Sequence, residues 1–338
     1  MLVPAKPTMH SDMQPMTTRY LLDPQLAAAV DRWPVLPLNL ETLDARRAAR
    51  AQLMEMLLPG LPPITEIQIG EHHVSAVDGG AAVRVLVYRP VEATGLLPAL
   101  LWIHGGGYVD GCADWDNHLA STIAREAKCC VVSVDYRLAP ETPFPGAIDD
   151  CYAALGWLHA NAAELRIDPQ RIGTAGISAG GGLAAALALM ARDRGELKVS
   201  FQVLLQPMLD DRHAVDSYSH PFAGEFIWTR EHNHFGWLAL LGREPGGDDV
   251  SPYAAAARAE SLQGLPPTFI SVGALDLFVE ENLEYARRLI REGVPTELHV
   301  HPGACHGFQF LAPDAAQAKL HDAIVIAALR RAMSPAAG

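Results

Sequence analysis

Between residues 83 and 310 the chain alternates short runs of β-branched and other apolar residues with segments of helical periodicity. Seven runs are candidate strands, at 83–88, 98–104, 129–136, 171–176, 201–206, 268–273 and 297–301. Several of these runs are apolar throughout, which is typical of strands that are covered on both faces. Strands that alternate with helices in this way predict an α/β fold with a mostly parallel sheet.

The segments between the strands carry helix signals. In residues 147–165, apolar side chains recur at steps of three and four residues and form one stripe. Residues 179–194 are apolar nearly all round, which predicts a buried central helix. Residues 280–294 contain Gly293 and are followed by Pro295, which is a helix stop signal.

Two stretches, 1–60 and 209–250, lie outside this alternation. The first contains a helical segment without a strand partner, and the second holds several histidines and aromatic residues without strand periodicity. Ligands in such sheets bind beyond the carboxyl ends of the strands, so we expect both stretches to form a helical cap there. The α/β core then consists of two parts, 61–208 and 251–338.

The charge balance and the apolar runs exclude several classes of function. The chain has 39 acidic and 26 basic residues and a formal net charge of -13, so neither nucleic acid nor an anionic membrane is an expected partner. The amino-terminal residues lack the apolar stretch of a secretion signal, and no run is long enough to span a membrane, which predicts a cytoplasmic protein. Five cysteines without C-x-x-C spacing predict reduced thiols and no zinc site.

The strongest local signal is Gly176-Ile177-Ser178-Ala179-Gly180, which fits G-x-S-x-G between a predicted strand and a predicted helix. In that context the glycines allow a sharp turn that exposes the serine hydroxyl above the sheet. The pattern alone fits two other structures equally well: a turn with Ser178 as a helix N-cap, or a phosphate cradle at the helix N-terminus.

A histidine and an acid follow the serine in the order that nucleophilic catalysis on this fold requires. Asp276 directly follows the strand at 268–273, and His306 lies in a glycine-containing loop after the last predicted strand. The carboxyl ends of parallel strands meet at one edge of a sheet, so Asp276 is placed to orient His306 beside Ser178. The order Ser178, Asp276, His306 is that of the α/β hydrolases.

Other acids and histidines compete for these roles. Asp210 and Asp211 are the alternative acid, because they follow the preceding predicted strand and their carboxylates can reach His306. His232 and His234 are two residues apart and cannot share a helix face, which argues against a metal site there.

Three consecutive glycines, Gly105, Gly106 and Gly107, follow the strand at 98–104. Acyl transfer through a serine builds negative charge on an oxygen, and each preorganised donor aimed at that oxygen contributes about 10²- to 10³-fold in rate. A tight turn alone would need one glycine rather than three. We therefore expect the N–H groups of Gly106, Gly107 and Ala179 to form an oxyanion hole.

These segments together resemble the hormone-sensitive-lipase-like (bacterial family IV) carboxylesterases of the α/β-hydrolase fold. The motifs HGGGYVDG, YRLAPE, GISAGGG and HPGACHGF occur in the family's order over residues 70–310. The resemblance implies a mostly parallel eight-stranded sheet flanked by helices, a helical cap, and no cofactor or metal. It also implies a serine carboxylesterase that hydrolyses short-chain esters through an acyl-enzyme, with Ser178 as nucleophile, His306 as general base and acid, and Asp276 as its orienting partner.

The resemblance further implies that Glu141 of YRLAPE fixes nearby loops and that His104 braces the glycine loop. The sequence departs from the family at Ile177, where many relatives have an acidic residue or threonine, and at Gln206, where many have an aromatic residue. These departures concern subfamily membership and the shape of the acyl pocket. We interpret Cys305 as a buried thiol.

The expected partner is a small-molecule ester, and the resemblance is compatible with a homodimer. Two other functions remain open on the same fold: a non-catalytic small-molecule receptor, and the hydrolysis of amides or lactones. Receptors on this fold commonly lack the histidine, so the presence of His306 favours an enzyme.

Overall fold

One mixed sheet organises the molecule. The structure is a computed structural model and describes residues 18–33, 36–77, 79–215 and 220–334. The strands described are β1 (Ile67–Val74), β2 (Val83–Pro90), β3 (Leu97–Ile103), β4 (Cys130–Asp135), β5 (Ile167–Ile177), β6 (Gln202–Leu205), β7 (Thr268–Gly273) and β8 (Thr296–His301). Their order is β1-β2-β4-β3-β5-β6-β7-β8, with β2 antiparallel to both neighbours and all other pairs parallel. The predicted mostly parallel eight-stranded sheet is confirmed.

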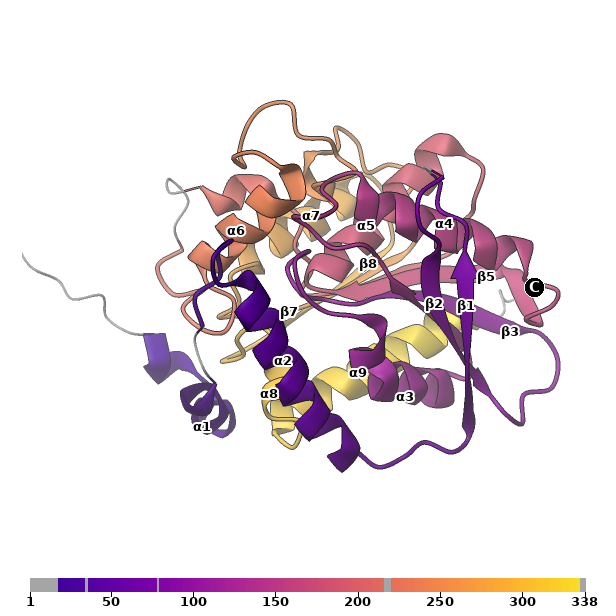
Figure 1. The fold of residues 1–338 in the computed structure, drawn as a ribbon, viewed down its shortest axis with the longest axis horizontal. Coiled ribbons are helices and arrows are strands. Elements are labelled where there is room, and N and C mark those ends of the chain that lie inside the picture. Colours follow the sequence, from indigo (N-terminus) through magenta and orange to yellow (C-terminus); the bar gives the residue numbers. More distant parts are fainter. Residues whose placement is uncertain (1–17, 34–35, 78, 216–219, 335–338) are drawn as a thin grey trace, which may run out of the picture.

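Helices cover both faces of this sheet (Figure 1). Those packed on it are α3 (Asn117–Ala127), α4 (Gly146–Ala160), α5 (Ala179–Arg194), α7 (Val279–Arg291) and α9 (Ala316–Met333). In β3, Leu100 and Trp102 belong to the apolar cluster of α3 and α9, whereas Leu101 and Ile103 belong to that of α4, α5 and α7. Successive strand residues point to opposite faces, so a strand covered on both sides is apolar throughout.

The edge strand β1 is absent from the seven predicted runs. It pairs with β2 along its whole length, and most of its residues between Ile67 and Val74 are exposed or half-buried. A strand with one wet face and a free edge has no continuous apolar run, which explains the omission. Strand β5 begins at Ile167, four residues before its predicted start at Arg171.

The remaining helices are α1 (Pro24–Arg32), α2 (Leu43–Leu57), α6 (Arg230–Leu241) and the short α8 (Phe308–Leu311). Figure 1 shows α2 and α6 at the same end of the sheet, and Arg46 of α2 lies 3.4 Å from His232 of α6. Helices α2 and α6, one from each predicted cap segment, are therefore in contact, and the helical cap itself stays a prediction. Residues 1–17, 34–35 and 216–219 of the predicted cap segments lie outside the described residues, and the boundaries of the four segments stay predictions.

Arg47 fastens the cap helix α2 to loops at the carboxyl ends of the strands. Its Nε donates to the carbonyl of Val109 at 2.7 Å, after β3, and its guanidinium pairs with Glu141 at 2.6 Å, after β4. The Arg47 guanidinium also lowers the pKa of Glu141. Glu141 therefore fixes nearby loops, as the resemblance implies. Among the described residues, no helix has both the length and the apolar character needed to cross a membrane.

Two helical glycines respond to alanine in opposite ways. A Cβ at Gly180 would lie 2.1 Å from the carbonyl oxygen of Ile103, whereas a Cβ at Gly156 meets nothing closer than Leu197 at 3.8 Å. We expect Gly180→Ala to lower the free energy of unfolding by about 3 kcal/mol through overpacking against fixed backbone. Gly156→Ala should raise it by about 0.5–1 kcal/mol through its higher helix propensity. Urea denaturation of both variants measures the difference, and equal effects would contradict the close backbone contact at Gly180.

Candidate active site

Ser178 occupies a sharp turn between β5 and α5. Its backbone has φ 57° and ψ -122°, a conformation that L-residues rarely adopt and that costs on the order of 1–3 kcal/mol. The turn is held because Gly176 and Gly180 have no Cβ: one at Gly176 would lie 2.3 Å from the Gly180 carbonyl oxygen. The Ser178 hydroxyl makes no N-cap hydrogen bond to α5. Ser178 is thus the N-cap residue of α5 by position only, and its hydroxyl does not cap the helix.

Ser178, His306 and Asp276 come together at the carboxyl edge of the sheet. The Nε2 atom of His306 lies 3.0 Å from Ser178 Oγ, and its Nδ1 atom lies 2.8 Å from Asp276 Oδ2. A carboxylate only accepts hydrogen bonds, so Nδ1 of a neutral His306 carries the proton and Nε2 accepts the Ser178 hydroxyl. The second Asp276 oxygen accepts the N–H of Phe278 at 3.0 Å, and the Phe278 ring meets the imidazole edge to face at 5.2 Å.

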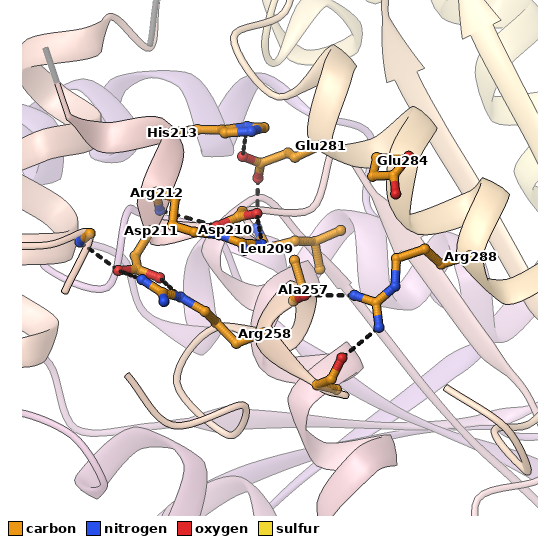
Figure 2. A network of polar contacts seen from close by, with 12 residues as sticks. Leu209, Asp210, Asp211, Arg212, His213, Ala257, Arg258, Glu281, Glu284 and Arg288 are labelled. Atoms are coloured by element: carbon orange, nitrogen blue, oxygen red, sulfur yellow. Dashed lines mark hydrogen bonds and ion pairs between the residues drawn. The ribbon is translucent and has the colours of Figure 1, made fainter. Parts of the chain in front are cut away.

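Asp210 and Asp211 are engaged elsewhere (Figure 2). Asp211 is buried and pairs with the Arg258 guanidinium at 2.7 and 2.8 Å, and Asp210 pairs with Arg212 at 2.6 Å. Both ion pairs stabilise the segment that follows β6. In the structure, the acid beside His306 is therefore Asp276, and neither of the two alternative acids contacts this histidine.

A second buried serine–histidine pair provides a comparison within the same chain. Ser271 Oγ lies 3.0 Å from His301 Nε2, the same distance as in the Ser178–His306 pair. Among the described residues, no carboxylate pairs with His301. Its ring packs against Phe308 and His321, and burial together with the charge of His321 lowers the pKa of His301 to about 4. His301 is thus a packing residue that resists protonation, unlike a histidine that has to hold a proton during catalysis.

The glycine loop after β3 lies against the serine turn. A Cβ at Gly105 would be 3.4 Å from Ser178 Cβ. Within the described residues, the backbone N–H groups of Gly106, Gly107 and Ala179 donate no hydrogen bond to another protein group. Three neighbouring donors without a protein acceptor fit the expected oxyanion hole.

The inference that a tight turn needs only one of these glycines is wrong. Gly106 has φ 131°, and a Cβ there would lie 1.8 Å from the Asp110 carbonyl oxygen; Gly107 has φ 62°, and a Cβ there would lie 2.1 Å from the Trp228 ring. Both positions therefore require glycine for backbone conformation and packing alone. An alanine at either position distorts the loop, so loss of activity in such a variant would not isolate the N–H donors.

His104 braces this loop, as expected. Its Nδ1 atom lies 2.8 Å from the carbonyl oxygen of Gly105, and its ring stacks on Tyr136 at 4.2 Å. Burial lowers the pKa of His104, so the ring is neutral and its Nδ1–H donates to that carbonyl. The Tyr136 hydroxyl donates in turn to the backbone carbonyl of His104 at 3.1 Å.

Two residues beside the site have roles that the sequence did not reveal. Trp228 packs on Gly107, and its ring centroid lies 6.4 Å from that of His306. Gln206 contacts the backbone of Gly307, next to His306. Trp228 was one of several aromatic residues in the cap segment, whereas a contact between positions 206 and 307 leaves no local pattern.

Cys305 is the buried thiol that the sequence predicted. It lies in an apolar cluster with Leu22 and Leu26 of the N-terminal segment, and burial raises the pKa of Cys305 to about 12. All five cysteines belong to described segments, and each is a free thiol. In the part of the chain that the structure describes, no group of three or more His, Cys, Asp or Glu side chains is arranged to hold a metal ion.

Glu281 lies in the first turn of α7, and its carboxylate links that helix to the segment after β6 (Figure 2). It accepts the N–H of Leu209 at 2.7 Å and pairs with His213 Nδ1 at 3.0 Å. Burial raises the pKa of Glu281 to about 7. Burial lowers the pKa of His213, but the hydrogen bond and charge of Glu281 outweigh it and raise that pKa overall. Glu281 and His213 line a pocket of about 450 Å³, whose walls include neither Ser178 nor His306.

The Glu281–His213 pair makes stability depend on pH. Both pKa values are raised on folding, so the folded protein binds protons more strongly than the unfolded chain from about pH 4.5, the unfolded value of Glu281, to about 7. The free energy of unfolding therefore falls as pH rises through that window. We expect Glu281→Gln, which keeps an acceptor for Leu209, to reduce this fall between pH 5 and 8 by on the order of 1–3 kcal/mol.

Urea denaturation at several pH values measures this effect. Glu284→Gln is the matched control, because Glu284 lies one turn along α7, is exposed, and has its pKa lowered by Arg287. An identical pH dependence for Glu281→Gln and the unmodified protein would contradict the role of this pair.

Comparison with known proteins shows which family the chain belongs to. A family model described as alpha/beta hydrolase fold matches residues 100–310. Carboxylesterase NlhH from Mycobacterium tuberculosis (strain ATCC 25618 / H37Rv) is 35% identical over 95% of this chain and 99% of its own. Among solved structures, a bacterial heroin esterase is 41% identical with a TM-score of 0.89, covering 94% of this chain and 100% of the other. Esterase LipW from Mycobacterium marinum is 36% identical with a TM-score of 0.84, covering 94% and 98%.

The matches to the three individual proteins extend over 94–95% of the chain, well beyond the short motifs of the sequence. The chain therefore belongs to the α/β-hydrolase family, and its resemblance to the hormone-sensitive-lipase-like carboxylesterases is confirmed.

Proposed function

We propose that this carboxylic ester hydrolase cleaves small, short-chain esters through a covalent intermediate on Ser178. The observation that carries the proposal is a pair of hydrogen bonds that joins three side chains. The Ser178 hydroxyl donates to His306 Nε2 at 3.0 Å, and His306 Nδ1–H donates to Asp276 at 2.8 Å. The imidazole of His306 is thus within reach of the Ser178 hydroxyl, and the Asp276 carboxylate lies on the other side of the imidazole. This is the arrangement that activates a serine.

The proposed reaction has two halves, and the first of them acylates Ser178. Ser178 Oγ attacks the ester carbonyl carbon while its proton passes to His306 Nε2, and Asp276 stabilises the imidazolium that forms. The tetrahedral intermediate collapses when the bond to the leaving alcohol breaks, and His306 returns the proton to that alcohol. Water then attacks the acyl-enzyme with His306 again as base, releasing the carboxylic acid and restoring the Ser178 hydroxyl.

The oxyanion formed in both halves needs donors already in place. The unused N–H groups of Gly106, Gly107 and Ala179 support this role, since they flank Ser178 and are fixed by a rigid loop and a helix start. The neutral His104 contributes by holding the Gly105 carbonyl, which keeps the loop in one conformation.

The preference for short acyl chains is supported by the position of Trp228. Its indole is buried, covers Gly107, and lies beside His306. A large ring at that place restricts the room beside the oxyanion loop. The relatives are named carboxylesterase and esterase, which agrees with ester substrates.

Ser178→Ala should abolish hydrolysis of p-nitrophenyl acetate or butyrate, with a loss of at least about 10⁴-fold in kcat. The reason is that no other nucleophile in the described part of the chain is hydrogen-bonded to His306 Nε2. Ser271→Ala is the matched control: it breaks the other buried serine–histidine bond and should retain activity. Ester hydrolysis assays and circular dichroism of both variants test this. Undiminished turnover in Ser178→Ala would refute the serine mechanism, and an unmodified protein without activity would favour a receptor.

Trp228→Ala should shift the preference toward longer acyl chains. Removing the indole opens space beside His306, so we expect the ratio of kcat/KM for octanoate over butyrate esters to rise by about tenfold. Trp157→Ala serves as control, since Trp157 lies on α4 against His72 of β1. An unchanged chain-length profile in Trp228→Ala would show that the indole does not bound the acyl site.

A further inference from the structure

The chain that leaves β6, from Leu205 to Leu209, is fastened to the nucleophile turn by its backbone. The N–H of Ser178 donates to the Leu205 carbonyl at 2.8 Å, and the N–H of Met208 donates to the Ser178 carbonyl at 3.0 Å. A Cβ at Gly182 would lie 2.1 Å from the Met208 carbonyl oxygen, so glycine permits this approach. The segment therefore fixes Ser178 from both sides.

The same segment is fastened to α7, the helix that follows Asp276. Asn282 donates from Nδ2 to the carbonyl of Pro207 at 2.7 Å. Glu281 accepts the N–H of Leu209 at 2.7 Å, as Figure 2 shows. The loops that carry the serine and the aspartate thus share one support, and the histidine loop is the third that needs one.

Gln206 supplies that third link through its side chain. Its Oε1 accepts the N–H of Gly307 at 2.7 Å, and its Nε2 donates to Gln309 Oε1 at 2.9 Å. A backbone N–H can only donate, so the contact with Gly307 fixes which amide atom is the oxygen. Gln206 is fully buried and has φ 48°, a strained left-handed backbone, and its own N–H donates to the Ser271 carbonyl at 2.7 Å.

We propose that Gln206 is a positioning residue that holds the His306 loop in register with Ser178. This inference rests on the proposed function, because positioning matters only if His306 is the base. The histidine loop contains Gly303 and Gly307, both with positive φ. Its backbone is held before His306, where the N–H of Leu275 donates to the Ala304 carbonyl at 2.9 Å. Gln206 holds the N–H one residue beyond His306. Displacing a reacting group by about 1 Å costs on the order of 10²-fold in rate.

The chain offers a matched control in β6, the strand that Gln206 directly follows. Gln202, at the opposite end of β6, is equally buried, and its Nε2 donates to Thr268 Oγ1 at 2.8 Å. Replacing either glutamine by leucine removes buried amide hydrogen bonds from β6 or its immediate end. Of the two glutamines, only Gln206 is linked to the histidine loop. Comparison of the two leucine variants therefore separates a general loss of stability from a loss of positioning.

The experiment compares Gln206→Leu, Gln202→Leu and Gln206→Glu in the full chain with p-nitrophenyl butyrate. We expect Gln206→Leu to lower kcat by about 10- to 100-fold with KM within about threefold, and Gln202→Leu to change kcat by less than about twofold. Gln206→Glu keeps an acceptor for Gly307, and a rotated Gln309 amide can donate to its second oxygen. It should recover about tenfold of the lost kcat.

Three results would overturn the inference. The first is an equal kcat in the two leucine variants, and the second is a change in KM alone for Gln206→Leu. The third is a kcat for Gln206→Glu that is as low as that for Gln206→Leu. If Gln206→Leu does not fold, Gln309→Leu replaces it, because it removes the partner of Gln206 Nε2 and should lower kcat about three- to tenfold. Unchanged kcat in that variant would equally overturn the inference. Ser178→Ala separates the two proposals: if it stays active, the proposed function fails; if it is inactive while Gln206→Leu matches Gln202→Leu, only the role of Gln206 fails.

Discussion

The contact between the serine turn and the end of β3 is the constraint on which the rest of the site depends. A Cβ at Gly180 would lie 2.1 Å from the Ile103 carbonyl oxygen, and one at Gly176 would lie 2.7 Å from the same oxygen. Because the turn sits directly on this strand, the glycine loop that follows Ile103 starts beside Ser178. Backbone packing thus brings the nucleophile close to the expected oxyanion donors, and side-chain contacts adjust their positions.

The charged groups near the carboxyl edge divide into two sets with different tasks. Asp276 uses its two oxygens for His306 and for a backbone N–H, whereas Asp211 and Glu281 are buried against Arg258 and His213. Losing one partner of such a buried pair leaves an uncompensated charge, so these pairs hold the segment after β6 firmly in one conformation. That segment supports the serine turn, and the structural ion pairs therefore act on the site from a distance.

Local sequence patterns predicted the parts of this protein whose structure is decided locally. The strands covered on both faces were recognisable because both their odd and even residues are buried, whereas β1, with one wet face, was not. The choice of Asp276 followed from its place at a strand end. Gln206 lay beyond such reasoning, since its contact with Gly307 joins loops 101 residues apart. The inference that three consecutive glycines exceed what a turn needs was wrong, because packing against Asp110 and Trp228 also requires glycine.

The two serine–histidine pairs show what a hydrogen bond alone does not decide. Ser178–His306 and Ser271–His301 have the same separation of 3.0 Å, and both are buried. His306 has a carboxylate on its far nitrogen, so an imidazolium formed there is paired at once. His301 faces His321 instead, and the pKa of His301 is lowered to about 4, so proton transfer from Ser271 would create an unpaired buried cation. The group behind the histidine, rather than its distance from the serine, separates a nucleophile from a structural hydroxyl.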